Sequence, residues 1–150
     1  MKIAVGADHG GYPLKQTVMD ELNRLGHTVV DCGAPAYDSK DDYPDLARAV
    51  GLAILRGQAE RGILLCGSGV GASIAANKLR GVRAAVCHDT YSAAQGVEHD
   101  AMNVLCLGSR IIGEELAKAL VRAFAAARFF TDPRFQRRLD KVIAIEQEQV

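Results

Sequence analysis

The chain has 150 residues, which is enough for one domain with a full hydrophobic core and too few for two, so we expect a single domain over residues 1–150. Eighteen basic and eighteen acidic residues give a formal net charge of zero, so no global field attracts nucleic acid or an anionic membrane. The sequence has no apolar run of about eighteen residues and does not begin with a basic region followed by an apolar one. We therefore expect a cytoplasmic protein with neither membrane nor nucleic acid as a partner.

Strands and helices are expected to alternate along the whole chain. Residues 2–7 are apolar, as in a strand covered on both faces, and Pro13 then suits the first turn of a helix that stops at Gly26. Such alternation is typical of an α/β fold, here a three-layer α/β/α sandwich around a five-stranded parallel, Rossmann-like sheet. The further predicted elements are a strand over 28–32, a helix over 44–56, a strand over 63–66, a helix over 70–79, a strand over 82–87, a helix over 90–98, a strand over 103–107, and helices over 113–127 and 134–148.

The segment from Gly62 to Gly71 runs an apolar strand into a glycine-rich turn, with Cys66 at the junction. The turn should lie at the N-terminus of the next helix, where unpaired main-chain N–H groups favour an anion. The same field favours the thiolate form of a cysteine. The sequence therefore predicts an anion-binding turn beside a candidate base or nucleophile.

Several polar residues are assigned to the ends of the predicted strands. Ligands of a parallel α/β sheet bind beyond the carboxyl ends of the strands. We place His99 and Asp100 on the loop before the fifth strand and expect them to share one rim with the others. The residues expected on this rim are Asp8, His9, Cys66, Gly67, Ser68, His88, Asp89, His99 and Asp100.

Other glycine-loop functions fit the turn less well. Gly67, Gly69 and Ala72 satisfy a relaxed dinucleotide fingerprint, but they follow the third strand rather than the first. A nucleotide-binding regulatory module without catalysis therefore remains an alternative. Alanine at position 72 excludes a cysteine phosphatase, which needs arginine there. The histidines and aspartates show no chelating spacing, so we predict no metal.

Two arginines in the last predicted helix could bind a phosphate. Arg134 and Arg138 lie one helical turn apart, and two guanidinium groups in that relation can hold one dianion. Base rates favour a solvated basic face that extends to Lys141, so the residues alone leave the two interpretations nearly even. A nucleic-acid site on this face is disfavoured by the zero net charge.

A series of motifs closely resembles the type B ribose-5-phosphate isomerases, of the wider family that includes allose- and galactose-6-phosphate isomerases. The resemblance extends from Lys2 to about Gln147. The matching motifs are Asp8-His9-Gly10-Gly11, Asp42-Tyr43-Pro44, Cys66-Gly67-Ser68-Gly69-Val70-Gly71, Ala75-Ala76-Asn77-Lys78, Gly81-Val82-Arg83-Ala84, His99, Asn103-Val104-Leu105 and Gly108-Ser109-Arg110.

The resemblance implies a metal-independent, cofactor-free aldose–ketose isomerase of the pentose phosphate pathway. Its substrates would be ribose 5-phosphate and ribulose 5-phosphate, interconverted through an enediolate. A six-carbon aldose 6-phosphate such as allose 6-phosphate is the alternative substrate. The resemblance also implies a homo-oligomer, a dimer or tetramer, whose last helix extends to a neighbouring subunit and whose active sites are shared between subunits.

The resemblance assigns roles to individual residues of this sequence. Cys66 would move the proton between C1 and C2, and His99 would help to open the furanose ring. Asp8 would contact sugar hydroxyls. The phosphate would be held by His9, Arg134 and Arg138, with Arg110 as a further contributor. The turn that would stabilise the enediolate oxygens consists of Gly67, Ser68, Gly69, Val70 and Gly71.

Two positions depart from the family pattern. Ser68 stands where many relatives have threonine, which preserves the hydroxyl. Asp100 stands where the family usually has asparagine, and an ionised carboxylate cannot donate a hydrogen bond to a substrate oxygen. Asp100 therefore turns away from the substrate, is protonated, or orients His99, and the departure leaves open a shifted sugar preference.

Overall fold

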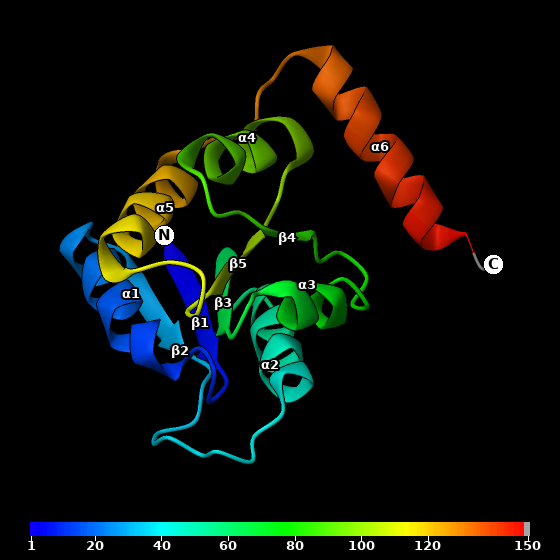
Figure 1. Cartoon of the computed structure of the whole chain (residues 1–150). Coiled ribbons are helices and arrows are strands. Elements are labelled where there is room, and N and C mark those ends of the chain that lie inside the picture. The colour runs from blue at the N-terminus through cyan, green and yellow to red at the C-terminus, as the bar shows by residue number, and fades with distance from the viewer. Residues whose placement is uncertain (149–150) are drawn as a thin grey trace.

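The computed structural model describes residues 1–148 and has five parallel strands in one sheet, with helices on both faces (Figure 1). This confirms the predicted three-layer α/β/α fold. The elements in chain order are β1 (Lys2–Ala7), α1 (Tyr12–Arg24), β2 (Thr28–Asp31), α2 (Tyr43–Leu55), β3 (Arg61–Cys66), α3 (Val70–Ala76), β4 (Ala84–Val86), α4 (Thr90–Asp100), β5 (Val104–Gly108), α5 (Glu114–Ala126) and α6 (Pro133–Gln147).

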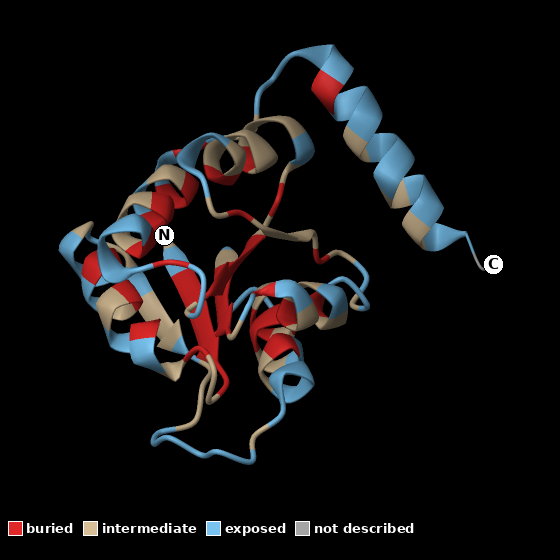
Figure 2. Cartoon of the chain, viewed as in Figure 1, coloured by how far each residue is buried: buried red, intermediate tan, exposed pale blue. Residues whose placement is uncertain are grey.

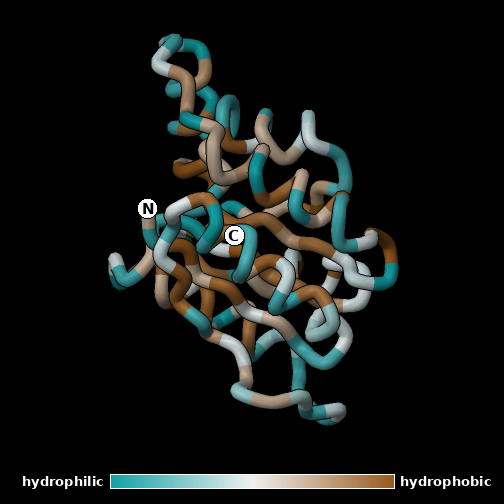
Figure 3. Tube along the Cα trace, turned by 90° about the vertical axis from the view of Figure 1, so that its left-hand side faces the viewer, coloured by the Kyte–Doolittle hydropathy of each residue, from teal (hydrophilic) through white to brown (hydrophobic). Residues whose placement is uncertain are grey.

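The sheet separates two hydrophobic cores. Successive strand side chains point to opposite faces, so Ile3 and Val5 pack with α1, α4 and α5, whereas Ala4 packs with α2 and α3. Figure 3 shows hydrophobic segments running through the middle of the molecule, where the strands lie. Burial on both faces explains why the strands are apolar without alternation.

The strand order is β2-β1-β3-β5-β4, so β1, β3 and β5 occupy the centre of the sheet. Ala7 pairs with Leu65, and Cys66 pairs with Gly108. The carboxyl ends of these three strands therefore lie side by side. The loops that follow them meet at one edge of the sheet, where α/β proteins bind ligands.

Two elements are each three residues shorter than predicted. The helix after the glycine turn ends at Ala76 rather than Leu79, and β4 covers only Ala84–Val86 rather than 82–87. Asn77 explains both limits, because its side chain accepts from the N–H of Ala84 and donates to the carbonyl of Ala84, each at 2.8 Å. These bonds tie the end of α3 to the start of β4 through a non-helical connection.

The last helix stands apart from the rest of the molecule (Figures 1 and 2). Phe135 is the one buried residue in the described part of α6, while Val142 and Ile145 are exposed. The far end returns to the body through Glu146, whose carboxylate accepts from the N–H of Gly81 at 2.7 Å. Between α6 and the edge strand β4 lies a cavity of about 540 Å³. The apolar side chains of α6 are thus only partly packed within one chain.

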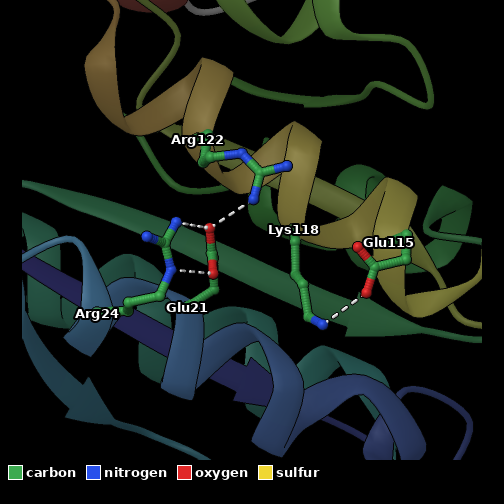
Figure 4. A network of polar contacts seen from close by, with 5 residues as sticks. All are labelled: Glu21, Arg24, Glu115, Lys118 and Arg122. Atoms are coloured by element: carbon green, nitrogen blue, oxygen red, sulfur yellow. Dashed lines mark hydrogen bonds and ion pairs between the residues drawn. The ribbon is translucent and has the colours of Figure 1, made fainter.

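A charged network joins α1 to α5 (Figure 4). The buried carboxylate of Glu21 accepts from Arg24 at 2.6 and 2.9 Å and from Arg122 at 2.8 Å. Hydrogen bonds from Arg24 lower the pKa of Glu21 to about 2, with a further contribution from Arg122. The neighbouring pair of Glu115 and Lys118 lies at the surface.

Candidate active site

A cavity of about 440 Å³ opens where the loops after β1, β3 and β5 meet, and we call it the Cys66 pocket. The N-terminus of α2 closes one side of it. The residues that line the Cys66 pocket are Asp8, His9, Gly10, Tyr43, Cys66, Gly67, Ser68, Gly71, Arg110 and Ile111.

Cys66 is held at the carboxyl end of β3 with 5% of its surface exposed. Its carbonyl accepts from the N–H of Ser109 at 2.9 Å, and its Sγ accepts from the N–H of Gly69 at 3.0 Å. Gly69 has φ +86°, a backbone conformation that glycine adopts readily. The glycine thus lets the chain turn back so that a main-chain donor reaches the sulfur.

The loops around the pocket pack main chain against main chain. A Cβ on Gly11 would lie 2.1 Å from the carbonyl of Leu65, and one on Gly108 would lie 2.6 Å from the carbonyl carbon of Ser68. Side chains at either position would push the loops apart. Ser109 adds a link across the site, because its hydroxyl donates to the carbonyl of Gly10. Close glycine packing therefore fixes the Cys66 turn against its neighbours.

Asp8 and His9 enter the pocket from the loop after β1. Asp8 is buried and accepts from the N–H of Gly11 at 2.9 Å. The ring of His9 contacts Asp41, with 2.8 Å between Nδ1 and Oδ1. This hydrogen bond is the main reason why the pKa of His9 is raised, with a smaller contribution from Asp8.

Arg110 approaches from the loop after β5. Its N–H donates to the carbonyl of Gly67 at 3.1 Å, and its side chain lies over Gly67. The turn itself carries Ser68, which is exposed and whose hydroxyl accepts from the N–H of Val70 at 3.3 Å. The predicted turn residues and Arg110 therefore share one site.

Two pocket neighbours were missing from the predicted site residues. Tyr43 begins α2 and lies so close to the turn that a Cβ on Gly71 would be 2.9 Å from its Cζ. The sequence indicates Tyr43 only through its place in the Asp42-Tyr43-Pro44 motif. Asp41 had no such signal, because its contact with His9 depends on how the loop between β2 and α2 folds.

The prediction that His99 and Asp100 share the rim of Cys66 is wrong for a single chain. Both residues belong to the last turn of α4 rather than to a loop. Because α4 runs back from the end of β4 to the start of β5, they lie at the sheet edge opposite to Cys66. Asp100 is exposed and lines the cavity beneath α6.

His99 packs instead against α6 and the segment before it. Its ring stacks on Phe135 with centroids 4.3 Å apart and lies 5.5 Å from Phe130, while its Nδ1 is 2.8 Å from Nε2 of Gln95. The exposed guanidinium groups of Arg134 and Arg138 lie beside the same Phe135 ring. We call the group formed by His99, Phe130, Arg134, Phe135 and Arg138 the Phe135 cluster.

The two predicted phosphate-binding arginines are brought together. Cζ of Arg134 lies 4.6 Å and Cζ of Arg138 lies 5.9 Å from the centroid of Phe135. Both side chains start from the exposed face of α6, so they remain accessible. The predicted site residues thus form two groups at opposite edges of one chain, apart from Asp100, which lies by the cavity under α6.

Within residues 1–148, no three or more His, Cys, Asp or Glu side chains gather in an arrangement that could hold a metal ion. No helix in that range is both long and apolar enough to cross a membrane.

Comparison with known proteins places this geometry in a family. The ribose/galactose isomerase model matches residues 3–142. The chain is 45% identical over 148 residues to ribose-5-phosphate isomerase B of Escherichia coli K12, covering 99% of this chain and 98% of that protein. It is also 45% identical over 129 residues to D-erythrulose-4-phosphate isomerase of Pectobacterium atrosepticum, covering 86% of this chain and 85% of that protein.

Solved structures of ribose-5-phosphate isomerases B have the same fold as this chain. Clostridium thermocellum ribose-5-phosphate isomerase B superposes with a TM-score of 0.93 at 43% identity, covering 98% of each chain. The Mycoplasma genitalium enzyme with bound ribulose-5-phosphate gives 0.92 at 40% identity, covering 99% of this chain and 97% of that one. Because these relatives are enzymes, we favour a catalytic function over the alternative of a nucleotide-binding regulatory module. The chain belongs to the ribose/galactose isomerase family.

Proposed function

We propose that this chain interconverts ribose 5-phosphate and ribulose 5-phosphate, with Cys66 as the group that moves the proton. The observation that carries the proposal is the hydrogen bond from Gly69 N–H to Cys66 Sγ, at 3.0 Å, inside a cavity lined by candidate sugar and phosphate ligands. Relatives named ribose-5-phosphate isomerase B match 98–99% of this chain.

The reaction needs a base and a stabiliser of negative charge. The Cys66 thiolate would take the proton from C2 of the open-chain aldose, which leaves an enediolate with a C1–C2 double bond, and the same proton would return to C1. A proton moves from the C2 hydroxyl to the C1 oxygen to complete the ketose. The N–H groups of the turn from Gly67 to Gly71 that are not bonded to Cys66 or Ser68 would stabilise the enediolate oxygens, together with the Ser68 hydroxyl.

The phosphate would be held away from the reacting carbons. His9 and Arg110 supply cationic or donor groups on the Cys66 side, and Asp8 would accept from sugar hydroxyls. Arg134 and Arg138 would complete the phosphate subsite, because guanidinium groups bind phosphate oxygens in pairs. Binding energy from the phosphate would orient the carbonyl end against Cys66.

The two groups of residues can act together only between subunits. We infer a homo-oligomer in which the Phe135 cluster of one subunit reaches the Cys66 pocket of another. The exposed apolar residues Val142 and Ile145 on α6 support this inference, because an arm with an unpacked apolar side favours a partner surface. His99 would then reach the substrate and assist opening of the furanose ring, and Asp100 would adjoin it as an acceptor for sugar hydroxyls.

The setting of the reaction follows from the same proposal. We place the enzyme in the cytoplasm and in the pentose phosphate pathway, as a single sugar-phosphate isomerase domain over residues 1–150. It would need neither metal nor cofactor, because the thiolate and the main-chain donors supply both functions of the mechanism.

A panel of sugar phosphates tests the proposal. Values of kcat/KM would be measured in the presence of EDTA for ribose 5-phosphate, D-erythrulose 4-phosphate and allose 6-phosphate. We expect ribose 5-phosphate to give the highest value. The four-carbon sugar is the second candidate, because a D-erythrulose-4-phosphate isomerase is 45% identical to this chain. A clear excess for either other sugar would replace the substrate, and loss of activity with EDTA would contradict the metal-free mechanism.

A further inference from the structure

Asp41 makes two hydrogen bonds to one residue of the Cys66 pocket. The main-chain N–H of His9 donates to Oδ1 of Asp41 at 2.8 Å, and the ring Nδ1 of His9 lies 2.8 Å from the same oxygen. The side chain of Asp41 is only 15% exposed, whereas that of His9 is 36% exposed. A carboxylate from the loop between β2 and α2 thus holds both the backbone and the ring of a residue that follows β1.

The contact determines which ring nitrogen faces the pocket. An ionised carboxylate only accepts, so Nδ1 must carry a hydrogen and donate to it. Nε2 lies on the far side of the ring and has no hydrogen-bond partner among residues 1–148. Because His9 lines the Cys66 pocket, Nε2 is the nitrogen available to a ligand there.

We propose that Asp41 is a positioning residue for phosphate binding: it fixes the His9 ring so that Nε2 donates to the phosphate of the sugar. This inference rests on the proposed function, since it concerns the phosphate subsite of that reaction. Asp41 itself does not line the pocket and acts through His9.

The charges around His9 fit this role. Asp41 and Asp8 both favour the protonated ring and raise the pKa of His9, the hydrogen bond to Asp41 being the largest cause. Arg110, Tyr43 and Cys66 are the other titratable groups that line the same pocket. A protonated ring has hydrogens on both nitrogens, so Nε2 can donate to a phosphate while Nδ1 donates to Asp41. A neutral ring that keeps its hydrogen on Nδ1 would instead turn a lone pair toward the anion.

Phosphate binding by His9 should weaken as the pH rises. Because the pKa of His9 is raised, its donation to phosphate is complete below the ordinary histidine value and is lost as the pH rises through the raised pKa. In Asp41→Asn the ring loses its anionic partner, so this loss should begin at a lower pH. The effect should fall on KM rather than on kcat, because the phosphate lies away from the reacting carbons.

The first experiment compares Asp41→Asn with a matched control. Asp45→Asn removes the same charge from an exposed position in the first turn of α2, four residues further along the chain. At slightly alkaline pH, Asp41→Asn should raise both KM for ribose 5-phosphate and the inhibition constant of inorganic phosphate about tenfold, with kcat within about twofold. At acidic pH the two variants should converge. An unchanged KM and phosphate inhibition in Asp41→Asn would overturn the proposal.

A double mutant separates positioning from mere support of the loop. Adding Asp41→Asn to His9→Asn should change KM no further, because the residue through which Asp41 acts is already lost. Equal losses in the presence and absence of His9 would show that Asp41 only supports the loop and would contradict the proposal.

An NMR titration of the His9 ring tests the same idea without turnover. The pKa of His9 should be lower in Asp41→Asn than in the wild type, and added inorganic phosphate should shift the His9 resonances of the wild type. If the wild type fails to convert ribose 5-phosphate yet both NMR results hold, the proposed substrate is wrong and the role of Asp41 stands. If the wild type is active and the titration is unchanged in Asp41→Asn, the role of Asp41 is wrong and the proposed function stands.

Discussion

The main-chain N–H of Gly69 lies 3.0 Å from Sγ of Cys66 and donates to it. Cys66 is 5% exposed, so this main-chain donor from the following turn is a contact that holds its sulfur in place. The donor belongs to the residue with φ +86° that turns the chain into α3. A single backbone conformation therefore shapes the turn and places a hydrogen-bond donor on the sulfur.

Gly69→Ala should lower activity far more than stability. The substitution forces an alanine to adopt a positive φ, which should lower the free energy of unfolding by about 1–2 kcal/mol. The new Cβ would also lie 3.3 Å from atoms of Leu107 and Val86. Relief of that strain should move the N–H away from Cys66, and we expect kcat to fall by about 10²-fold or more, as when an anion-stabilising donor is lost.

Gly57→Ala is the matched control for this strain. Gly57 has φ +69° and a Cβ there would meet nothing within 4 Å, so the substitution brings the same backbone penalty with no contact near the site. Denaturation curves should show similar losses for the two variants, while steady-state rates should differ. Equal rates would show that the turn at Gly69 does not serve catalysis.

Cys66→Ala should remove the group that we propose to transfer the proton. We expect kcat to fall by about 10²–10⁴-fold while the protein stays folded, because the change is small and the site lies at the end of a strand. Cys32→Ala serves as the control, since Cys32 is half-buried and its thiol contacts the carbonyl of Val30 away from the pocket. Circular dichroism would confirm folding, and full turnover in Cys66→Ala would exclude the proposed base.

Mixed subunits test whether sites are shared. Cys66→Ala and His99→Asn should each be nearly inactive alone. If one site takes Cys66 from one subunit and His99 from another, refolding an equimolar mixture into dimers should restore about a quarter of wild-type activity. Activity no higher than the mean of the two variants would mean that each chain works alone.

Glu21→Gln should destabilise the contact between α1 and α5. Glu21 is buried and bonds both Arg24 and Arg122 (Figure 4), and a hydrogen bond between charged groups contributes about 1.5–3 kcal/mol. The lowered pKa of Glu21, about 2, means that its stabilisation is present above the ordinary glutamate value and is lost as the pH falls toward 2.

The exposed pair of Glu115 and Lys118 provides the control for Glu21→Gln. Glu115→Gln breaks the exposed contact with Lys118 on the same helix, and exposed pairs contribute about 0–1 kcal/mol. Chemical denaturation at neutral pH and near pH 3 should show a deficit for Glu21→Gln that narrows in acid. A deficit that is the same at both pH values would contradict a role for the ionised carboxylate.

The sequence was most informative where local patterns decide structure. The alternation of apolar strands and amphipathic helices predicted all eleven elements and the parallel sheet, and the glycines around Cys66 predicted its turn. It failed where distant contacts decide. Asn77 limits β4 by bonding Ala84, and a loop conformation brings Asp41 to His9. The misplacement of His99 has another cause. A helix between parallel strands runs back to their amino ends, so the predicted sheet itself required His99 to lie opposite Cys66.

The central and the edge strands of the sheet are followed by residues with different roles. The central strands β1, β3 and β5 are followed by most of the residues that line the Cys66 pocket, whereas the edge strands β2 and β4 are followed by residues that hold others in place. After β2 comes Asp41, which bonds His9, and after β4 comes His88, whose Nε2 accepts from the N–H of Gly108 at 3.0 Å. Substitutions in the loops after the edge strands β2 and β4 should therefore change affinity and rate gradually. The loops after the central strands should tolerate almost no substitutions.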